Sequence, residues 1–190
     1  MIKKENKEKE EIKLFEKRML FYILTSRFNN YYWNINKNYR IKNNIKCIYG
    51  SPITISKKIA YKKECIVLEM NNDINKIIGI GLIENYPYLN KHKIYNNKYD
   101  RYIYTSNKWI DVLKLLSICK ENIDNNYEKE EINIKNKEII IMIEVLEQLC
   151  FYGNEHLKRG NGLKIFPIKY LYRLEKELNI IKILKDLFNI

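Results

Sequence analysis

Apolar and polar residues recur along this chain with two different periods, which separate helical parts from extended parts. In residues 12–28 the apolar side chains recur at helical spacing and predict an amphipathic helix. Residues 29–46 contain seven Asn and three Tyr without a clean period. This second segment predicts a loop or irregular stretch anchored by its aromatic side chains.

The middle of the chain has the shorter period that is typical of strands. Two short apolar runs, CIVLEM and KIIGIGLIENY, are separated by NNDIN, and its Asn and Asp residues favour a turn. Residues 65–86 therefore predict a hairpin. In YDRYIYTSNKW the aromatic residues alternate with polar ones, which places Tyr102 and Tyr104 on one face of a further strand.

Helical spacing returns after this strand. Asp111 is the predicted N-cap of a helix that carries an apolar stripe. The run KEIIIMIEVLEQLCFY predicts another helix, with a buried strand as the alternative. Residues 168–190 predict a C-terminal helix whose apolar residues lie on one side.

These elements predict an α+β fold, in which a small, curled, mostly antiparallel sheet is flanked by N-terminal and C-terminal helices. At 190 residues the chain is long enough to bury a substantial core. We expect residues 1–46 to form an N-terminal helical segment and loop. Residues 47–190 are expected to form the α+β core domain with its C-terminal helix.

Several classes of protein are disfavoured by the same patterns. The longest apolar run is interrupted by Glu144 and Glu147, so we expect no membrane span. The start MIKKENKEKEEIK lacks the apolar region of a secretory signal. No Cys or His spacing fits a metal site, so we expect reduced, buried thiols in an intracellular protein. The four cysteines are Cys47, Cys65, Cys119 and Cys150.

The charge of the chain favours a polyanionic partner. Lys and Arg number 35 against 23 Asp and Glu, which gives a formal net charge of +12. A balance of this sign favours nucleic acid or an anionic membrane surface. Part of the Lys and Asn excess reflects the codon usage of an AT-rich genome, which weakens the charge argument.

Three of the six glycines fall within GNEHLKRGNG, residues 153–162. Glycine lets backbone amides approach a phosphate, while Lys158, Arg159 and the following Lys164 supply positive charge. His156 adds a hydrogen-bond donor. The segment therefore predicts a phosphate contact. A plain turn between two apolar elements and catalysis by His156 are the alternatives.

The pair Gly79-x-Gly81 does not match a dinucleotide-binding fingerprint, because Glu84 occupies the position of the third glycine. Glycine inside a strand more often marks a bulge or the close approach of another group. We therefore predict a bulge here, and no cofactor.

Aromatic and basic residues share the strand around Trp109. Aromatic rings and Arg planes stack on unpaired bases, although packing in the core is an alternative for the tyrosines. Combined with the glycine segment, this strand predicts one basic, aromatic-edged surface, on which Arg159 and Trp109 lie together. The predicted nucleic-acid-binding residues are Arg101, Tyr104, Lys108, Trp109, His156, Lys158, Arg159 and Lys164.

The segments GSPITIS, CIVLEMNN, KIIGIGLIENYP and DRYIYTSNKW together resemble the small sheets of the PUA-like superfamily, which includes the ASCH, EVE and YTH branches. The resemblance implies binding of RNA or modified bases, sometimes in an aromatic-lined pocket, and favours RNA over duplex DNA. The whole chain, including CFYGNEHLKRGNG, also looks like proteins of large AT-rich DNA viruses. That likeness implies the cytoplasm or nucleus of a host cell, or the virion.

The sequence therefore predicts a nucleic-acid-binding module whose ligand is RNA or another single strand. No catalytic residue, metal or cofactor is assigned to it. One alternative is a non-enzymatic structural or interaction protein that docks a protein partner through its C-terminal helix. Another is a metal-dependent nuclease that gathers four carboxylates. Those carboxylates are Asp73, Glu84, Asp100 and Asp111.

Overall fold

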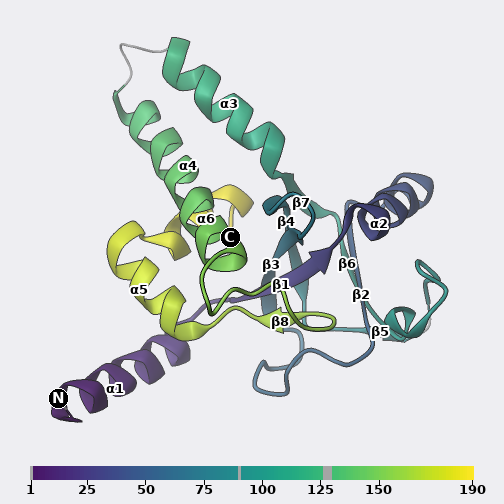
Figure 1. Cartoon of the computed structure of the whole chain (residues 1–190), viewed down its shortest axis with the longest axis horizontal. Helices are drawn as coiled ribbons and strands as arrows, with labels where there is room; N and C mark the ends of the chain where they lie inside the picture. Colours follow the sequence, from purple (N-terminus) through teal and green to yellow (C-terminus); the bar gives the residue numbers. More distant parts are fainter. Residues whose placement is uncertain (1, 90, 126–129) are drawn as a thin grey trace.

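The computed structural model describes residues 2–89, 91–125 and 130–190 of the chain. Within these ranges the protein has an α+β fold with six α-helices, one short 3-10 helix and eight strands (Figure 1). The elements in chain order are α1 (Ile2–Arg18), β1 (Tyr22–Phe28), α2 (Asn30–Asn43), β2 (Cys47–Ser51), β3 (Glu64–Asn71), β4 (Lys76–Glu84), β5 (Tyr88–Leu89), η1 (Lys98–Asp100), β6 (Tyr102–Ser106), β7 (Lys108–Asp111), α3 (Val112–Asn125), α4 (Glu130–Phe151), β8 (Lys164–Ile165), α5 (Ile168–Leu178) and α6 (Ile180–Phe188). The predicted α+β class is confirmed.

The strands form two sheets. The larger has the order β7-β4-β3-β1-β8, and the smaller has the order β2-β6-β5. β1 and β3 run parallel, whereas the other described pairs are antiparallel. Only Asn107 separates β6 from β7, so one extended run of chain passes from the smaller sheet to the larger. The strands are mostly antiparallel as predicted, but the sheet is not strongly curled.

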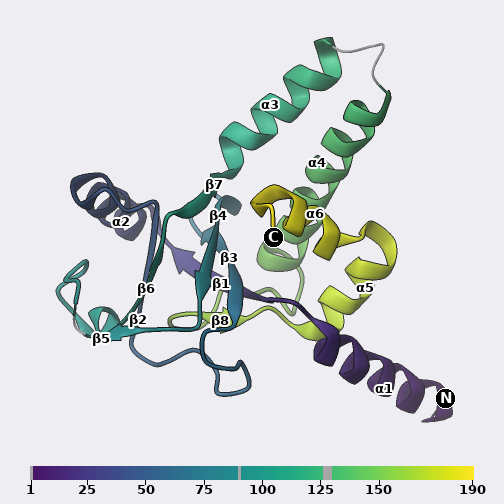
Figure 2. The same ribbon diagram turned by 180° about the vertical axis from the view of Figure 1, so that it is seen from behind.

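The larger sheet is buried on both faces. On β3, Ile66 and Leu68 point to one face while Cys65 and Val67 point to the other, and all four are 0% exposed. The first face packs against α3–α6, and the second packs against the smaller sheet (Figures 1 and 2). Burial on both faces explains the nearly continuous apolar sequence of β3 and β4.

The prediction of one helix over residues 12–28 is wrong in its second half. α1 ends at Arg18, and the chain then enters β1, which lies between β3 and β8. Ile23 and Leu24 are both fully buried, on opposite faces of the sheet. A strand that is buried on both faces lacks polar alternation, so its apolar run was compatible with helical spacing. Residues on both sides of position 47 contribute to the same core.

The Asn-rich segment after β1 was predicted to be irregular but forms α2. The Asn29 side chain accepts a hydrogen bond from the Tyr32 amide at 2.8 Å, and Asn44 ends the helix with a φ of 52°. The buried residues of α2 are Asn36 and Arg40. Because this helix is anchored by caps and by buried polar residues, no apolar period reveals it.

β3 and β4 form the predicted hairpin, and the predicted bulge is also present. Glu69 lies opposite Gly79 while Met70 lies opposite Ile77, so Ile78 is the additional residue on β4. By contrast, most of GSPITIS is not a strand, because β2 ends at Ser51 and the chain continues as a connection to β3.

The C-terminal residues form two helices rather than one. α5 and α6 are separated at Asn179, which has a φ of 48°. Their apolar stripe packs into the core beside α4, which is the predicted helix and not the alternative strand. Its buried members include Leu171, Leu174, Ile180, Ile183 and Leu184. The stripe proposed for docking a partner is thus covered by the chain itself.

Two further expectations concern the described ranges as a whole. None of their helices has the length and apolar character that crossing a bilayer requires. The four cysteines are free and buried, as predicted.

Candidate nucleic-acid interface

A small pocket lies where β1 ends, beside the first turn of α2. Its volume is about 110 Å³. Three tyrosines from two separate segments line it, together with Arg27 and two glycines of the 153–162 segment. We call it the tyrosine pocket; the tyrosines are Tyr32, Tyr95 and Tyr99.

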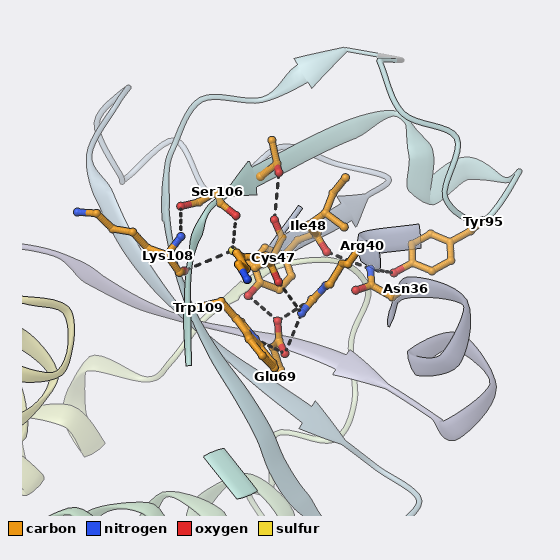
Figure 3. Close-up of polar contacts among 12 residues, drawn as sticks. Asn36, Arg40, Cys47, Ile48, Glu69, Tyr95, Ser106, Lys108 and Trp109 are labelled. Atoms are coloured by element: carbon orange, nitrogen blue, oxygen red, sulfur yellow. Dashed lines mark hydrogen bonds and ion pairs between the residues drawn. The ribbon is translucent and has the colours of Figure 1, made fainter. Parts of the chain in front are cut away.

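The three rings support one another edge to face. The ring centroids of Tyr32 and Tyr95 are 5.6 Å apart, and those of Tyr95 and Tyr99 are 6.4 Å apart, with interplanar angles of 80° in both pairs. The Tyr95 hydroxyl also accepts a hydrogen bond of 2.8 Å from Asn36 Nδ2, as Figure 3 shows. These contacts hold the aromatic wall in one arrangement.

Asp100 holds the segment that carries Tyr95. Its carboxylate accepts hydrogen bonds of 2.7–3.1 Å from the backbone amides of Ile94, Tyr95 and Asn96. The Asp100 residue is only 8% exposed. A buried carboxylate with several amide donors is well satisfied, so Asp100 positions the pocket wall and is not free to hold a metal.

The glycine segment forms the opposite wall, and Arg27 holds it. Arg27 Nε donates to the Leu157 carbonyl at 2.5 Å, and Nη1 donates to the Gly162 carbonyl at 3.4 Å. Burial lowers the pKa of the Arg27 guanidinium, which nevertheless stays protonated at neutral pH. The Tyr99 hydroxyl donates to Asn161 Oδ1 at 2.9 Å and joins the two walls.

Two glycines of this segment that line the tyrosine pocket adopt positive φ angles, which residues with a side chain rarely adopt. Gly160 has a φ of 123°, and Gly162 has a φ of 64°. A side chain at Gly162 would also overlap Ser51 at the end of β2. The glycines therefore let the backbone pass near the smaller sheet, where it forms one wall of the tyrosine pocket.

The predicted residues of this segment remain close together in the structure. Lys158 Nζ donates to Asn75 Oδ1 at 2.8 Å, while Arg159 is exposed beside Gly160. The Lys164 side chain is exposed and approaches within 3.7 Å of the position that a Cβ at Gly160 would take.

His156 and Arg101 have distinct local roles. His156 Nδ1 accepts a hydrogen bond of 3.4 Å from the Lys158 amide, within its own loop. Arg101 follows η1 on the surface, with its guanidinium carbon 5.2 Å from the Tyr102 ring centroid. Arg101 is thus two residues from Tyr99 of the tyrosine pocket.

Tyr104 belongs to the core and not to the predicted surface. Its ring is 0% exposed, and its hydroxyl accepts a hydrogen bond of 3.0 Å from the Ile55 amide. The opposite orientation of neighbouring strand residues explains this, because the face that carries Tyr104 is the one that packs on the larger sheet.

Trp109 and the glycine segment lie at opposite edges of the larger sheet, because β7 and β8 are its two edge strands. Along the paired strands Trp109 lies opposite Gly81, then Val67, Leu24 and Ile165 in turn. Four strand spacings of about 4.8 Å separate Trp109 from β8 by about 19 Å. The structure therefore does not bring Trp109 and its exposed neighbour Lys108 together with Lys164.

The Trp109 indole instead takes part in a buried polar network, shown in Figure 3. Glu69 is 0% exposed and accepts hydrogen bonds from Arg40 at 2.6 Å, from the Tyr49 hydroxyl at 2.7 Å and from Trp109 Nε1 at 3.0 Å. A side chain at Gly79 would overlap the Glu69 carboxylate. We call these four side chains, those of Arg40, Tyr49, Glu69 and Trp109, the Glu69 network.

Burial and charge shift the titration of this network. Burial, followed by the charge of Glu69, raises the pKa of Tyr49 well above its ordinary value. For Arg40, burial lowers the pKa, but the attraction of Glu69 contributes to a net increase. The pKa of the neighbouring Cys47 thiol rises to about 12, mainly through burial. The network therefore keeps one ion pair in the core with neutral phenol and thiol groups around it.

Sequence reasoning did not identify Arg40 or Glu69. Arg40 lay in a segment predicted to be irregular, and Glu69 was one polar residue within an apolar strand. The signal present in the sequence was Gly79-x-Gly81. Two glycines that are two residues apart lie on the same face of a strand, and the absence of side chains there leaves space for large polar groups. Gly81 provides that space for the Tyr49 hydroxyl.

The four carboxylates of the nuclease alternative do not form a cluster, because they lie in different parts of the fold. Asp73 accepts from the Asn30 amide, and Asp111 caps α3 through the Lys114 amide. Glu84 is exposed at the end of β4. Among the residues that the structure describes, no cluster of three or more His, Cys, Asp or Glu side chains could hold a metal ion.

Comparison with known proteins adds no assignment. No protein-family model, curated protein or solved structure matches this chain.

Proposed function

We propose that this protein binds single-stranded nucleic acid and that the tyrosine pocket receives one unpaired base. The observation that carries this proposal is the pocket itself, a cavity of about 110 Å³. Its walls contain three tyrosine rings and Arg27, which is hydrogen-bonded to the glycine segment. An enclosed cavity of about 150 Å³ accommodates benzene, and this pocket is smaller but open to solvent, so it suits the inserted edge of one flat ring.

The surroundings of the pocket supply contacts for the sugar-phosphate backbone. Arg159 is exposed on the glycine segment, Lys164 is exposed just after it at the start of β8, and Arg101 is exposed beyond Tyr99. Positive side chains next to a stacking pocket suit a strand whose base is inserted while its phosphates remain in solvent. The formal net charge of +12 favours the same partner.

A single strand fits this arrangement better than a duplex. A base within a duplex is stacked and paired, and it must leave the stack before it can enter a pocket. The resemblance to PUA-like domains predicted from the sequence favours RNA as the ligand. Within this proposal, Asp100 and Arg27 are positioning residues that hold the two walls.

Fluorescence anisotropy with a fluorescein-labelled octauridylate tests the proposal. Two or three phosphate contacts give a slope of about −1.4 to −2.1 for log affinity against log salt. Affinity should therefore fall about seven- to eighteenfold between 50 and 200 mM salt. Equal affinity at the two salt concentrations would contradict the proposal.

A variant pair tests the pocket itself. Tyr99→Ala should weaken binding about five- to 150-fold, since stacking on an aromatic ring contributes about 1–3 kcal/mol per base. Tyr61→Ala is the matched control, because Tyr61 is 65% exposed and packs on Tyr86, away from the pocket. Equal affinity of the two variants would show that the tyrosine pocket does not receive a base.

A further inference from the structure

A second concave site lies on the other side of α2. It is a groove of about 520 Å³ between α2 and the edge formed by β4, β7 and the start of α3. Trp33 and Trp109 both line it, and the chain contains only these two tryptophans. Its remaining apolar surface comes from side chains such as Ile78 and Leu113. We call it the tryptophan groove.

Arg40 connects the groove with the Glu69 network below it. The guanidinium carbon lies 5.0 Å from the Trp33 ring centroid and 5.7 Å from that of Trp109, and the residue is 5% exposed. Its Nε atom is buried and has no hydrogen-bond partner in the described part of the protein. Buried donors are normally satisfied, so this N–H is available to an acceptor atom of a bound molecule or of water.

The charges around the groove favour an anionic occupant. Lys37 and Lys46 line it and are exposed, whereas Asp111 is the acidic residue among the lining side chains. The positive charge of Arg40 is already matched by Glu69. An occupant with a flat apolar face, hydrogen-bond acceptors and a negative charge fits these features, and a nucleotide has all three.

The groove and the tyrosine pocket are adjacent. Phe28 lines the tyrosine pocket, and its ring packs edge to face on Trp33 with centroids 5.4 Å apart. Tyr32 and Trp33 are consecutive residues in the first turn of α2, and each lines one of the two sites. A strand that passes across the first turn of this helix, which with its side chains is about 10–12 Å wide, reaches both sites.

We propose that the tryptophan groove is a second base-binding subsite, which takes a neighbouring nucleotide of the strand held in the tyrosine pocket. This inference rests on the proposed function. The base stacks against the indole surface, its carbonyl or phosphate oxygen lies over Arg40, and Lys37 and Lys46 contact the backbone. The groove thereby extends recognition from one nucleotide to at least two.

Intrinsic fluorescence reports directly on the groove, because both tryptophans lie there. Titration with unlabelled octauridylate should quench tryptophan emission over the same concentration range in which the anisotropy of the labelled strand rises. Trp33→Leu, which retains an apolar side chain, should weaken binding about five- to 150-fold, the effect of losing one base–aromatic stack.

A pair of lysine variants on α2 provides the matched control. Lys37→Ala should reduce the salt slope by about 0.7, as expected for the loss of one phosphate contact to a single strand. Lys42→Ala should leave the slope unchanged, since Lys42 is exposed on the same helix but does not line the groove. Because both lysines are exposed, neither substitution leaves a cavity in the core, and a difference between the two variants reports on binding.

The outcomes separate the two proposals. If octauridylate binds with the expected salt dependence but the fluorescence is constant and the two lysine variants behave alike, the groove is not a subsite and the tyrosine pocket is retained. Complete absence of octauridylate binding would overturn both. Quenching together with a specific effect of Lys37→Ala supports the second subsite.

Discussion

Replacing Glu69 by Gln removes the negative charge at the centre of the Glu69 network and leaves its shape nearly unchanged. In the native protein the Arg40–Glu69 pair has an N–O distance of 2.6 Å, and the two side chains are 6% and 0% exposed. Glu69→Gln therefore leaves the Arg40 charge in the core without its counterion. Removal of one partner from a buried pair costs about 3–5 kcal/mol of unfolding free energy.

Such a loss is large compared with a total stability of about 5–15 kcal/mol for a typical domain. Urea unfolding followed by tryptophan fluorescence measures it, because Trp33 and Trp109 both lie near Arg40. Glu64→Gln is the matched control on the same strand, since Glu64 is partly exposed at the beginning of β3. It should change the unfolding free energy by less than about 0.5 kcal/mol.

A double-mutant cycle tests the coupling itself. Arg40→Met removes the cation, and combining it with Glu69→Gln removes both charges, so the double variant should be destabilised by less than the sum of the single variants. The expected difference is about 1–3 kcal/mol. Additive effects, or a loss below about 1 kcal/mol for Glu69→Gln, would contradict an energetic coupling between Arg40 and Glu69.

Two further predictions concern glycine and cysteine positions. Gly162→Ala should lower the unfolding free energy by more than the roughly 1–2 kcal/mol of its left-handed backbone alone, because its side chain also overlaps a neighbour. Gly153→Ala, where the φ is 80° and the space is open, shows the backbone cost by itself in parallel thermal unfolding, and an equal effect of both variants would contradict this. Burial raises the pKa of Cys47, Cys65 and Cys150 to about 12, so these thiols should resist a disulfide reagent at pH 8 in the native protein and react once urea unfolds it. Thiols of the unfolded chain lose their protons at about pH 8.5, whereas the buried thiols keep theirs, so the unfolding free energy should fall as pH rises from there towards 12. A constant unfolding free energy across that range would contradict the raised pKa values of these cysteines.

The errors of the sequence-based fold prediction have a common cause. A strand that is buried on both faces, such as β1, has no alternating polar residues to distinguish it from a helix. α2 contains many Asn residues, and its stability depends on the Asn29 cap and on two buried polar side chains. The Asn29 cap is local, but the burial of β1 and of Asn36 and Arg40 arises from packing between segments that are distant in the chain, so local periodicity does not reveal it.

The candidate site was only partly predictable for the same reason. The glycine segment and its basic residues were visible in the sequence, because glycine and Arg–Lys clusters are local signals. The tyrosine pocket combines residues from positions 26–32, 50, 95–99 and 160–162. Tyrosine is common in this chain, with 16 residues, so composition does not distinguish the three that line the pocket.

Local sequence patterns were sufficient to predict the α+β class, the β3–β4 hairpin with its bulge, the helix at α4 and the buried thiols. These follow from apolar periods, turn residues and cysteine spacing, which act over short stretches of chain. The contacts between charged and aromatic residues, by contrast, depend on the tertiary structure. It separated Trp109 from Lys164 by the width of the sheet, paired Arg40 with Glu69 in the core, and brought Arg27 under the glycine segment. The physical reason is that strand order and the packing of the two sheets set these distances, and strand order depends on contacts between residues far apart in the sequence.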